Sequence, residues 1–211
     1  MKALVIAALI LFVFGPGPAD VGQEDLDARV RKFLDANRGQ WRDLNVPAVD
    51  GQTLHDIILK NKYTRALEIG TSTGHSGIWI AWALSKTDGK LITIDIDERR
   101  HRQAVANFEA AGLSRFIDAR LGDAHQIVPA LSGPFDFVFS DADKDWYKNY
   151  LIAVLPKLDV GGGYVTHNVS SGRQRGGGQG DYLVYLQSLP NLETTVDTRG
   201  AGMAISYKKA K

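Results

Sequence analysis

The stretch ALEIGTSTGHSGIWIA, residues 66–81, joins an apolar run to a helix-like run through a glycine-containing turn. Residues 66–69 predict a buried strand, and residues 76–84 predict the helix that follows it. A strand, a glycine turn and a helix in this order are typical of an α/β sheet, in which ligands bind beyond the carboxyl ends of the strands. The stretch therefore predicts a fold class and the edge at which a site would lie.

The turn contains Gly70, Gly74 and Gly77, which would let its backbone approach a ligand closely. A dinucleotide-binding turn has the pattern G-x-G-x-x-G and faces a pyrophosphate with a helix N-terminus. Here Ser72 stands where the middle glycine would be. From the turn alone, a cofactor cradle and a purely structural strand-to-helix connection are equal alternatives.

Strands and helices continue to alternate along the chain. Further strand-like runs lie at 91–94, 116–121, 135–139 and 164–166, and helical segments between them lie at 98–111, 124–131 and 146–155. Such alternation predicts a doubly wound, mostly parallel α/β sheet with helices on both faces. Runs at 192–197 and 203–207, separated by a short glycine-containing turn, predict an antiparallel hairpin at the end of the sheet.

The N-terminal segment MKALVIAALILFVFGPGPAD differs from the rest of the chain. One lysine, an apolar run over residues 3–14 and a Gly/Pro break predict a signal peptide at residues 1–19. The alternative is an N-terminal anchor or a buried or interfacial helix. A stable transmembrane helix is disfavoured, because the apolar run is too short to span a bilayer. We exclude this segment from the fold prediction.

The composition limits the remaining organisation and function. The 211 residues suit one domain, with amphipathic N-terminal helices over 20–62 and the sheet-containing core over 63–211. The chain has 25 Lys and Arg against 24 Asp and Glu, so no charge excess indicates nucleic-acid binding. Because the sequence has no cysteine, it excludes disulfides, thiolate metal sites and a cysteine nucleophile.

Acidic residues follow the next two predicted strands. Asp95 ends a strand where a carboxylate can accept hydrogen bonds from both hydroxyls of a ribose, which suits an NAD enzyme or an adenosyl-cofactor enzyme. Asp97 is better explained as the N-cap of the following helix. Asp123 could cap its own helix or reach an adenine amino group, and these alternatives are equal.

The stretch SDADKDWY, residues 140–147, brings carboxylates and an amine to the same sheet edge as Gly70 and Asp95. Together with ALEIGTSTGHS, TIDID, GDA and the HNV that follows GGGYV, it resembles the class I S-adenosylmethionine-dependent O-methyltransferases of the catechol and caffeoyl-CoA type. The resemblance runs in order from Gly51 to Tyr207. It implies a Rossmann-like, seven-stranded, mostly parallel sheet with an antiparallel C-terminal strand, and it allows a homodimer.

The resemblance also implies a role for each matching residue. Lys144 would be the general base beside the acceptor hydroxyl, and Asp141 would also be catalytic. The acceptor would be a vicinal diphenol, whose hydroxyls a divalent cation can bind and acidify; the ligands to that cation would be Asp141, His167 and Asn168. The residues implied to bind S-adenosylmethionine are Glu68, Gly70, Ser72, Gly74, Ser76, Asp95, Asp123, Ala124 and Asp141.

His167 departs from the family, which has Asp at this position. An imidazole in place of a carboxylate removes a negative charge and a hard oxygen, so a metal site here would favour manganese or another transition metal over magnesium. Two alternatives stay open. His167 could itself be the general base of a metal-free site, or it could be a polar residue at a strand end without a function.

Two other functions remain in view. An NAD-dependent oxidoreductase would share the Gly70 turn and Asp95, but it gives the SDADK stretch no role. A catalytically degenerate adenosyl-ligand binding protein would keep its affinity for the cofactor without methyl transfer.

The leader indicates export or membrane attachment, whereas the cytosolic supply of adenosylmethionine argues for the cytoplasm.

Overall fold

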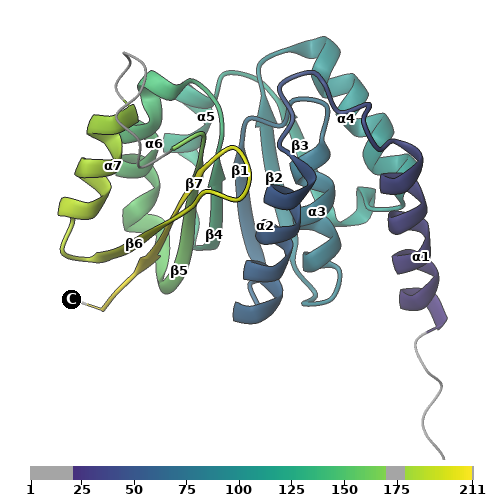
Figure 1. The fold of residues 1–211 in the computed structure, drawn as a ribbon, viewed down its shortest axis with the longest axis horizontal. Helices are drawn as coiled ribbons and strands as arrows, with labels where there is room; N and C mark the ends of the chain where they lie inside the picture. Colours follow the sequence, from purple (N-terminus) through teal and green to yellow (C-terminus); the bar gives the residue numbers. More distant parts are fainter. Residues whose placement is uncertain (1–20, 170–178, 211) are drawn as a thin grey trace, which may run out of the picture.

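The computed structural model describes residues 21–169 and 179–210, with the side chains of residues 21–24, 179 and 180 left out. The predicted leader at residues 1–19 lies outside the described residues. Figure 1 shows the order of the elements and their arrangement. Within the described ranges, no helix is both long and apolar enough to cross a membrane.

The centre of the molecule is a seven-stranded sheet in the order β3-β2-β1-β4-β5-β7-β6. Five strands run parallel, and β7 pairs antiparallel with both β5 and β6. The predicted fold, a mostly parallel sheet with an antiparallel C-terminal strand, is therefore confirmed. The strands are β1 (Arg65–Ile69), β2 (Lys90–Asp95), β3 (Ile117–Leu121), β4 (Phe135–Ser140), β5 (Leu158–His167), β6 (Leu192–Asp197) and β7 (Met203–Lys208).

Helices cover both faces of this sheet. Figure 1 shows α1 beside α4 at one end and α7 beside β6 at the other. One face is covered by four helices, α1 (Val21–Ala36), α2 (Ala48–Asn61), α3 (His75–Leu84) and α4 (Glu98–Ala111). The other face is covered by α5 (Ala124–Ala130), α6 (Tyr147–Val154) and α7 (Gln179–Ser188).

The core has a separate part on each face because successive side chains of a strand point to opposite faces. Leu67 and Val138 pack with α5, α6 and α7. Phe137 and Phe139 pack with α2 and α3 on the other face, where a further cluster joins α1, α3 and α4 around Phe108. Burial on both faces explains why the strand sequences are nearly continuous apolar runs.

The largest difference between the predicted and observed strand bounds is in β5. The prediction covered residues 164–166, whereas the strand runs over Leu158–His167. Its middle contains Gly161, Gly162 and Gly163, which lack the branched side chains that signal a strand. The register between β4 and β5 also shifts in this part, between Phe135 and Phe137.

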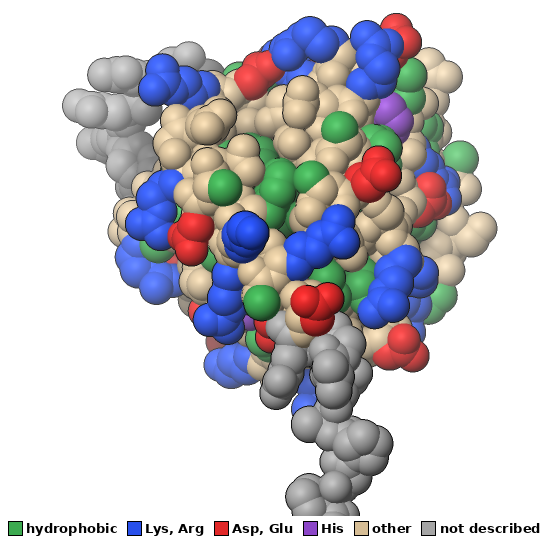
Figure 2. Space-filling model, turned by 90° about the vertical axis from the view of Figure 1, so that its right-hand side faces the viewer, with side chains coloured by type: hydrophobic (Ala, Val, Ile, Leu, Met, Phe, Trp, Pro, Cys, Tyr) green, Lys and Arg blue, Asp and Glu red, His purple; other side chains and the backbone are tan. Residues whose placement is uncertain are grey.

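The surface carries both signs of charge. Figure 2 shows basic and acidic side chains interspersed on the face that lies at the right of Figure 1. On α4, Arg102 pairs with Glu98 one turn earlier, and Arg99 pairs with Asp43. This mixture agrees with the net charge of +1.

Candidate active site

A cavity of about 740 Å³ lies beyond the carboxyl ends of β1, β2, β4 and β5. Neighbouring strands β1 and β4 stand where the strand order reverses, which is where open α/β sheets bind ligands. The loops after these strands line the cavity, together with the segment before α2 and the turn between β6 and β7. The cavity thus occupies the sheet edge that the sequence predicted.

The turn after β1 packs closely against the turn after β4. Gly70 has φ +98°, and a Cβ there would lie 3.0 Å from the backbone carbonyl carbon and oxygen of Asp141. Gly74 lies against Phe108 on α4 instead, where a Cβ would be 2.7 Å from the ring. The two glycines therefore have different roles. Gly70 shapes the cavity wall, as a cofactor cradle requires, and Gly74 allows helix packing, as a structural connection requires.

Six of the residues predicted to bind the cofactor line this cavity: Gly70, Ser72, Asp95, Asp123, Ala124 and Asp141. The other three, Glu68, Gly74 and Ser76, are not part of its lining. Both side chains in that group, Glu68 and Ser76, are buried. They support the wall from behind.

Glu68 is fully buried below the Gly70 turn. The hydroxyl of Thr93 donates a hydrogen bond to its Oε2 at 2.6 Å. Burial raises the pKa of Glu68 to about 8, although hydrogen bonds from Ser76 and Thr93 partly oppose this increase. The folded protein therefore holds Glu68 largely protonated at neutral pH.

The carboxylates after β2 and β3 also hold local structure. Asp95 accepts hydrogen bonds from the backbone N–H groups of Ser72 at 2.7 Å and Asp97 at 2.8 Å. Asp97 caps α4 by accepting from the N–H of Arg100, as predicted. Asp123 caps α5 through the N–H of His125 at 2.9 Å and also lines the cavity, so the capping role and access to a ligand coexist.

His125 is a lining residue that sequence reasoning missed. Its ring stacks on Trp146 with centroids 3.6 Å apart and planes 10° apart. Its Nε2 lies 2.9 Å from an oxygen of Asp143. This flat, stacked pair stands beside Asp123 and Ala124, where an aromatic ring of a ligand could pack.

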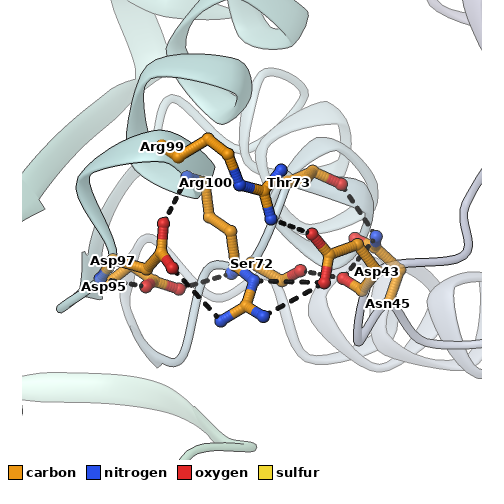
Figure 3. A network of polar contacts seen from close by, with 8 residues as sticks. All are labelled: Asp43, Asn45, Ser72, Thr73, Asp95, Asp97, Arg99 and Arg100. Carbon is orange, nitrogen blue, oxygen red and sulfur yellow. Dashed lines mark hydrogen bonds and ion pairs between the residues drawn. The ribbon is translucent and has the colours of Figure 1, made fainter.

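The segment between α1 and α2 is fastened over the Gly70 turn by the polar network in Figure 3. Asp43 pairs with Arg99 and Arg100, and these two arginines lower the pKa of its carboxyl. Its backbone carbonyl accepts a hydrogen bond from the Ser72 hydroxyl. Asn45 donates to the Thr73 hydroxyl at 2.7 Å. The N-terminal segment thereby forms one wall of the cavity, with Leu44, Asn45 and Pro47 in the lining.

Two carboxylates contact His167, which also lines the cavity. Its Nε2 lies 2.9 Å from Oδ2 of Asp50, and its Nδ1 lies 2.9 Å from Oδ2 of Asp141. Nδ1 lies within ion-pair distance of Asp141 but makes no hydrogen bond. Burial lowers the pKa of His167, but the contacts with Asp141 and Asp50 more than offset it and raise the pKa to about 9.

The metal site that the resemblance implies at Asp141, His167 and Asn168 stays a prediction. An imidazole binds a metal through the lone pair of an unprotonated nitrogen. Nε2 of His167 pairs with Asp50, whereas its buried Nδ1 has no hydrogen-bond partner and lies 2.9 Å from Oδ2 of Asp141. Among residues 21–169 and 179–210, no three His, Asp or Glu side chains are placed to share a metal ion.

Lys144 and Asn168, also predicted as site residues, both line the cavity near Asp141. Lys144 is exposed and begins the short helical turn Lys144–Trp146. Asp50, which sequence reasoning missed, lies 117 positions from His167 in the chain. The local sequence gives Asp50 only the signal of an acidic residue in the first turn of a helix, where the helix dipole favours negative charge.

Comparison with known proteins identifies relatives of this chain. The family model described as "O-methyltransferase" matches residues 22–171. A catechol O-methyltransferase of Niastella koreensis is 44% identical over 88 residues, which are 40% of this chain and 39% of that protein. Caffeoyl-CoA O-methyltransferase 1 of Eucalyptus globulus is 35% identical over 127 residues, 58% of this chain and 51% of that protein. The matched region thus spans about half the length of these relatives or less.

Solved structures of similar proteins cover most of the chain. The O-methyltransferase from Bacillus cereus in complex with SAH is 25% identical, with a TM-score of 0.74 over 87% of this chain and 91% of that one. The O-methyltransferase TomG from Streptomyces achromogenes, in complex with SAM, is 28% identical, with a TM-score of 0.70 over 86% of this chain and 90% of that one.

Proposed function

The chain belongs to the O-methyltransferase family, and we propose that it transfers the methyl group of S-adenosylmethionine to a hydroxyl of a small catechol-like acceptor. The observation that carries the proposal is the placement of Asp95, Asp123 and Asp141 around the Gly70 turn of one cavity. Similar structures named as complexes with SAM or SAH support the cofactor. Relatives named for catechol and caffeoyl-CoA support the class of acceptor.

The cofactor end of the cavity offers a partner for each part of an adenosyl ligand. The Asp95 carboxylate at the tip of β2 would accept hydrogen bonds from the ribose hydroxyls. Asp123 and His125 would border the adenine, the first as an acceptor and the second as a flat surface. The Gly70 turn and Asp141 would hold the charged methionine end, because a carboxylate there can pair with an ammonium group.

The chemistry supplied by the cofactor is a methyl group on a positively charged sulfur. During transfer the acceptor oxygen forms a bond to the methyl carbon as the carbon–sulfur bond breaks, and the hydroxyl proton leaves. The chain must therefore align the acceptor and remove that proton. Lys144 borders the cavity beside Asp141 and would accept the proton in its neutral form. Asp141, His167 and Asn168 would hold a divalent cation, which when bound would lower the pKa of the acceptor hydroxyl; the buried Nδ1 of His167, which has no hydrogen-bond partner, supports this part of the proposal.

Calorimetry and product analysis together test this function. We expect the protein to bind S-adenosylmethionine but not NAD, and to give a methyl ether when a catechol is supplied with cofactor carrying a deuterated methyl group. Binding of the cofactor without transfer to a panel of diphenols would favour an adenosyl-ligand binding protein. Binding of NAD alone would favour an oxidoreductase.

A further inference from the structure

We infer that Asp43 is a positioning residue for the binding of S-adenosylmethionine. It holds the segment of residues 42–47 against the turn after β1, and through this contact it keeps Ser72 and Asp95 in place for the cofactor. The inference rests on the proposed function and adds to it a residue that is not itself part of the cavity lining.

The side chain of Asp43 is anchored on the start of α4. It pairs with Arg99 and with Arg100, whose guanidinium nitrogen lies 3.1 Å from Oδ1 of Asp43. Figure 3 shows both arginines converging on this one carboxylate. Arg100 also lines the cavity, and α4 begins only three residues after Asp95. The anchor therefore lies beside the predicted ribose-binding carboxylate.

The backbone of the same segment contacts the turn after β1. The carbonyl of Asp43 accepts a hydrogen bond from the Ser72 hydroxyl, and the backbone N–H of Ser72 donates to Oδ2 of Asp95 at 2.7 Å. Two residues further along the segment, Asn45 donates to the Thr73 hydroxyl at 2.7 Å. Two successive hydrogen bonds thus connect Asp43 with the Asp95 carboxylate.

The backbone conformation of Ser72 indicates that these contacts are needed. Ser72 has φ +48° and Leu44 has φ +53°, in the left-handed region that residues with a Cβ adopt only where surrounding contacts fix them. Glycine would adopt this conformation at a lower cost, but it has no hydroxyl for the carbonyl of Asp43. This requirement gives a reason for serine at the position where a dinucleotide-binding turn has glycine.

The anchored segment also brings Leu44 into the cavity lining. The Leu44 side chain is 71% exposed, so a ligand that covers it removes apolar surface from water. If the contacts of Asp43 were lost, binding would have to order the segment and the turn as well as the ligand. The cost of this ordering would be subtracted from the affinity.

Asp43→Asn tests the role of the carboxylate. We expect isothermal titration calorimetry to show about a fivefold increase in the Kd for S-adenosylmethionine, the size expected from the loss of two partly exposed ion pairs. Asp43→Glu keeps the charge and should restore part of the affinity. Unchanged affinity in Asp43→Asn would overturn the inference.

Asp159→Asn is the matched control for a purely structural effect. It removes the ion pair of Asp159 with Arg65, whose exposure is similar to that of the Asp43 pairs, at the opposite end of the sheet from the cavity. It should lower the free energy of unfolding by an amount similar to that in Asp43→Asn and leave the Kd within about twofold of wild type. An equal loss of affinity in the two variants would show that Asp43 acts only through overall stability.

A double-mutant cycle with Ser72→Ala tests the path to the turn, because this substitution removes only the hydroxyl. If Asp43 acts through Ser72, Asp43→Asn should raise the Kd less in the Ser72→Ala protein than in wild type. Additive losses would overturn the path through Ser72.

Amide hydrogen exchange, measured by NMR without cofactor, separates this inference from the proposed function. The backbone N–H of Ser72 should exchange at least about fivefold faster in Asp43→Asn than in wild type or Asp159→Asn, because its contact with Asp95 is less well held. An unchanged exchange rate would overturn the positioning role. Absence of S-adenosylmethionine binding in wild type would count against the proposed function, and the exchange rates would still show whether Asp43 holds the turn.

Discussion

The carboxylate of Asp95 accepts a hydrogen bond from the backbone N–H of Ser72 at 2.7 Å, which ties the end of β2 to the turn after β1. Each carboxylate oxygen can accept more than one hydrogen bond, so this tie still allows Asp95 to meet a ligand hydroxyl. The same side chain would thus order the turn and bind the ribose.

We predict that Asp95→Ala weakens adenosylmethionine binding by about 1–3 kcal/mol, because charged hydrogen bonds to the ribose are lost. Isothermal titration calorimetry measures the change. Asp97→Ala is the matched control: it removes the cap of α4 and should lower the free energy of unfolding by about 1 kcal/mol without changing affinity. Unchanged affinity in Asp95→Ala would refute the ribose assignment.

Gly70→Ala tests the close packing of the two turns. The substitution places a Cβ at φ +98° and 3.0 Å from the backbone of Asp141. Gly39 has φ +80° with nothing within 4 Å of a Cβ, so Gly39→Ala measures the backbone cost alone. We expect that cost to be about 1 kcal/mol, and a larger loss of stability in Gly70→Ala. Equal losses in urea denaturation would show that the contact with Asp141 is unimportant.

Glu68 predicts a pH dependence of stability. Its pKa is about 8 in the folded protein against an ordinary value of 4.5. A raised pKa means that the folded state binds the proton more tightly, so this stabilising contribution is complete below pH 4.5 and is lost as the pH rises through about 8. The expected slope within this window is on the order of 1 kcal/mol per pH unit.

Glu68→Gln should remove that slope, because the amide keeps an oxygen for Thr93 but does not ionise. Urea denaturation at several pH values between 5 and about 9 compares the two proteins. Glu98→Gln on the exposed start of α4 is the control and should follow wild type. A wild-type slope identical to that of Glu68→Gln would show that Glu68 is ionised in the folded protein.

The fold could be predicted because its signals are local. Apolar runs mark the buried strands, and the capping residues Asp97 and Asp123 mark helix starts. The predicted glycine turn and Asp95 meet at one cavity because the carboxyl ends of parallel strands share an edge. The local pattern did not predict the first residues of β5, because three successive glycines separate them from the apolar run that follows.

The surroundings of His167 could not be predicted in the same way, because their contacts join distant parts of the chain. Asp50 and His167 come from α2 and β5, and Ala201 reaches Asp50 from a turn 151 positions away. Asp43 similarly meets Arg100 across 57 positions. Each of these residues alone suits an exposed loop or helix start, and only the folded chain shows that Asp50 and His167 are buried together.

Lys144→Met tests the proposed base. The side chain borders the cavity next to Asp141, and loss of a positioned general base should lower kcat by about 10²–10⁴-fold. Methionine keeps a chain of similar length without the amine, so adenosylmethionine affinity should stay within about twofold, because Lys144 is assigned to the acceptor. Lys148→Met is the matched control, since Lys148 lies four residues further along the chain in α6, is also exposed and lies over the Tyr185 ring. Single-turnover rates in both variants separate the transfer step from product release. A Lys144→Met rate equal to that of Lys148→Met would remove Lys144 from the reaction and leave the hydroxyl proton to another group at the cavity.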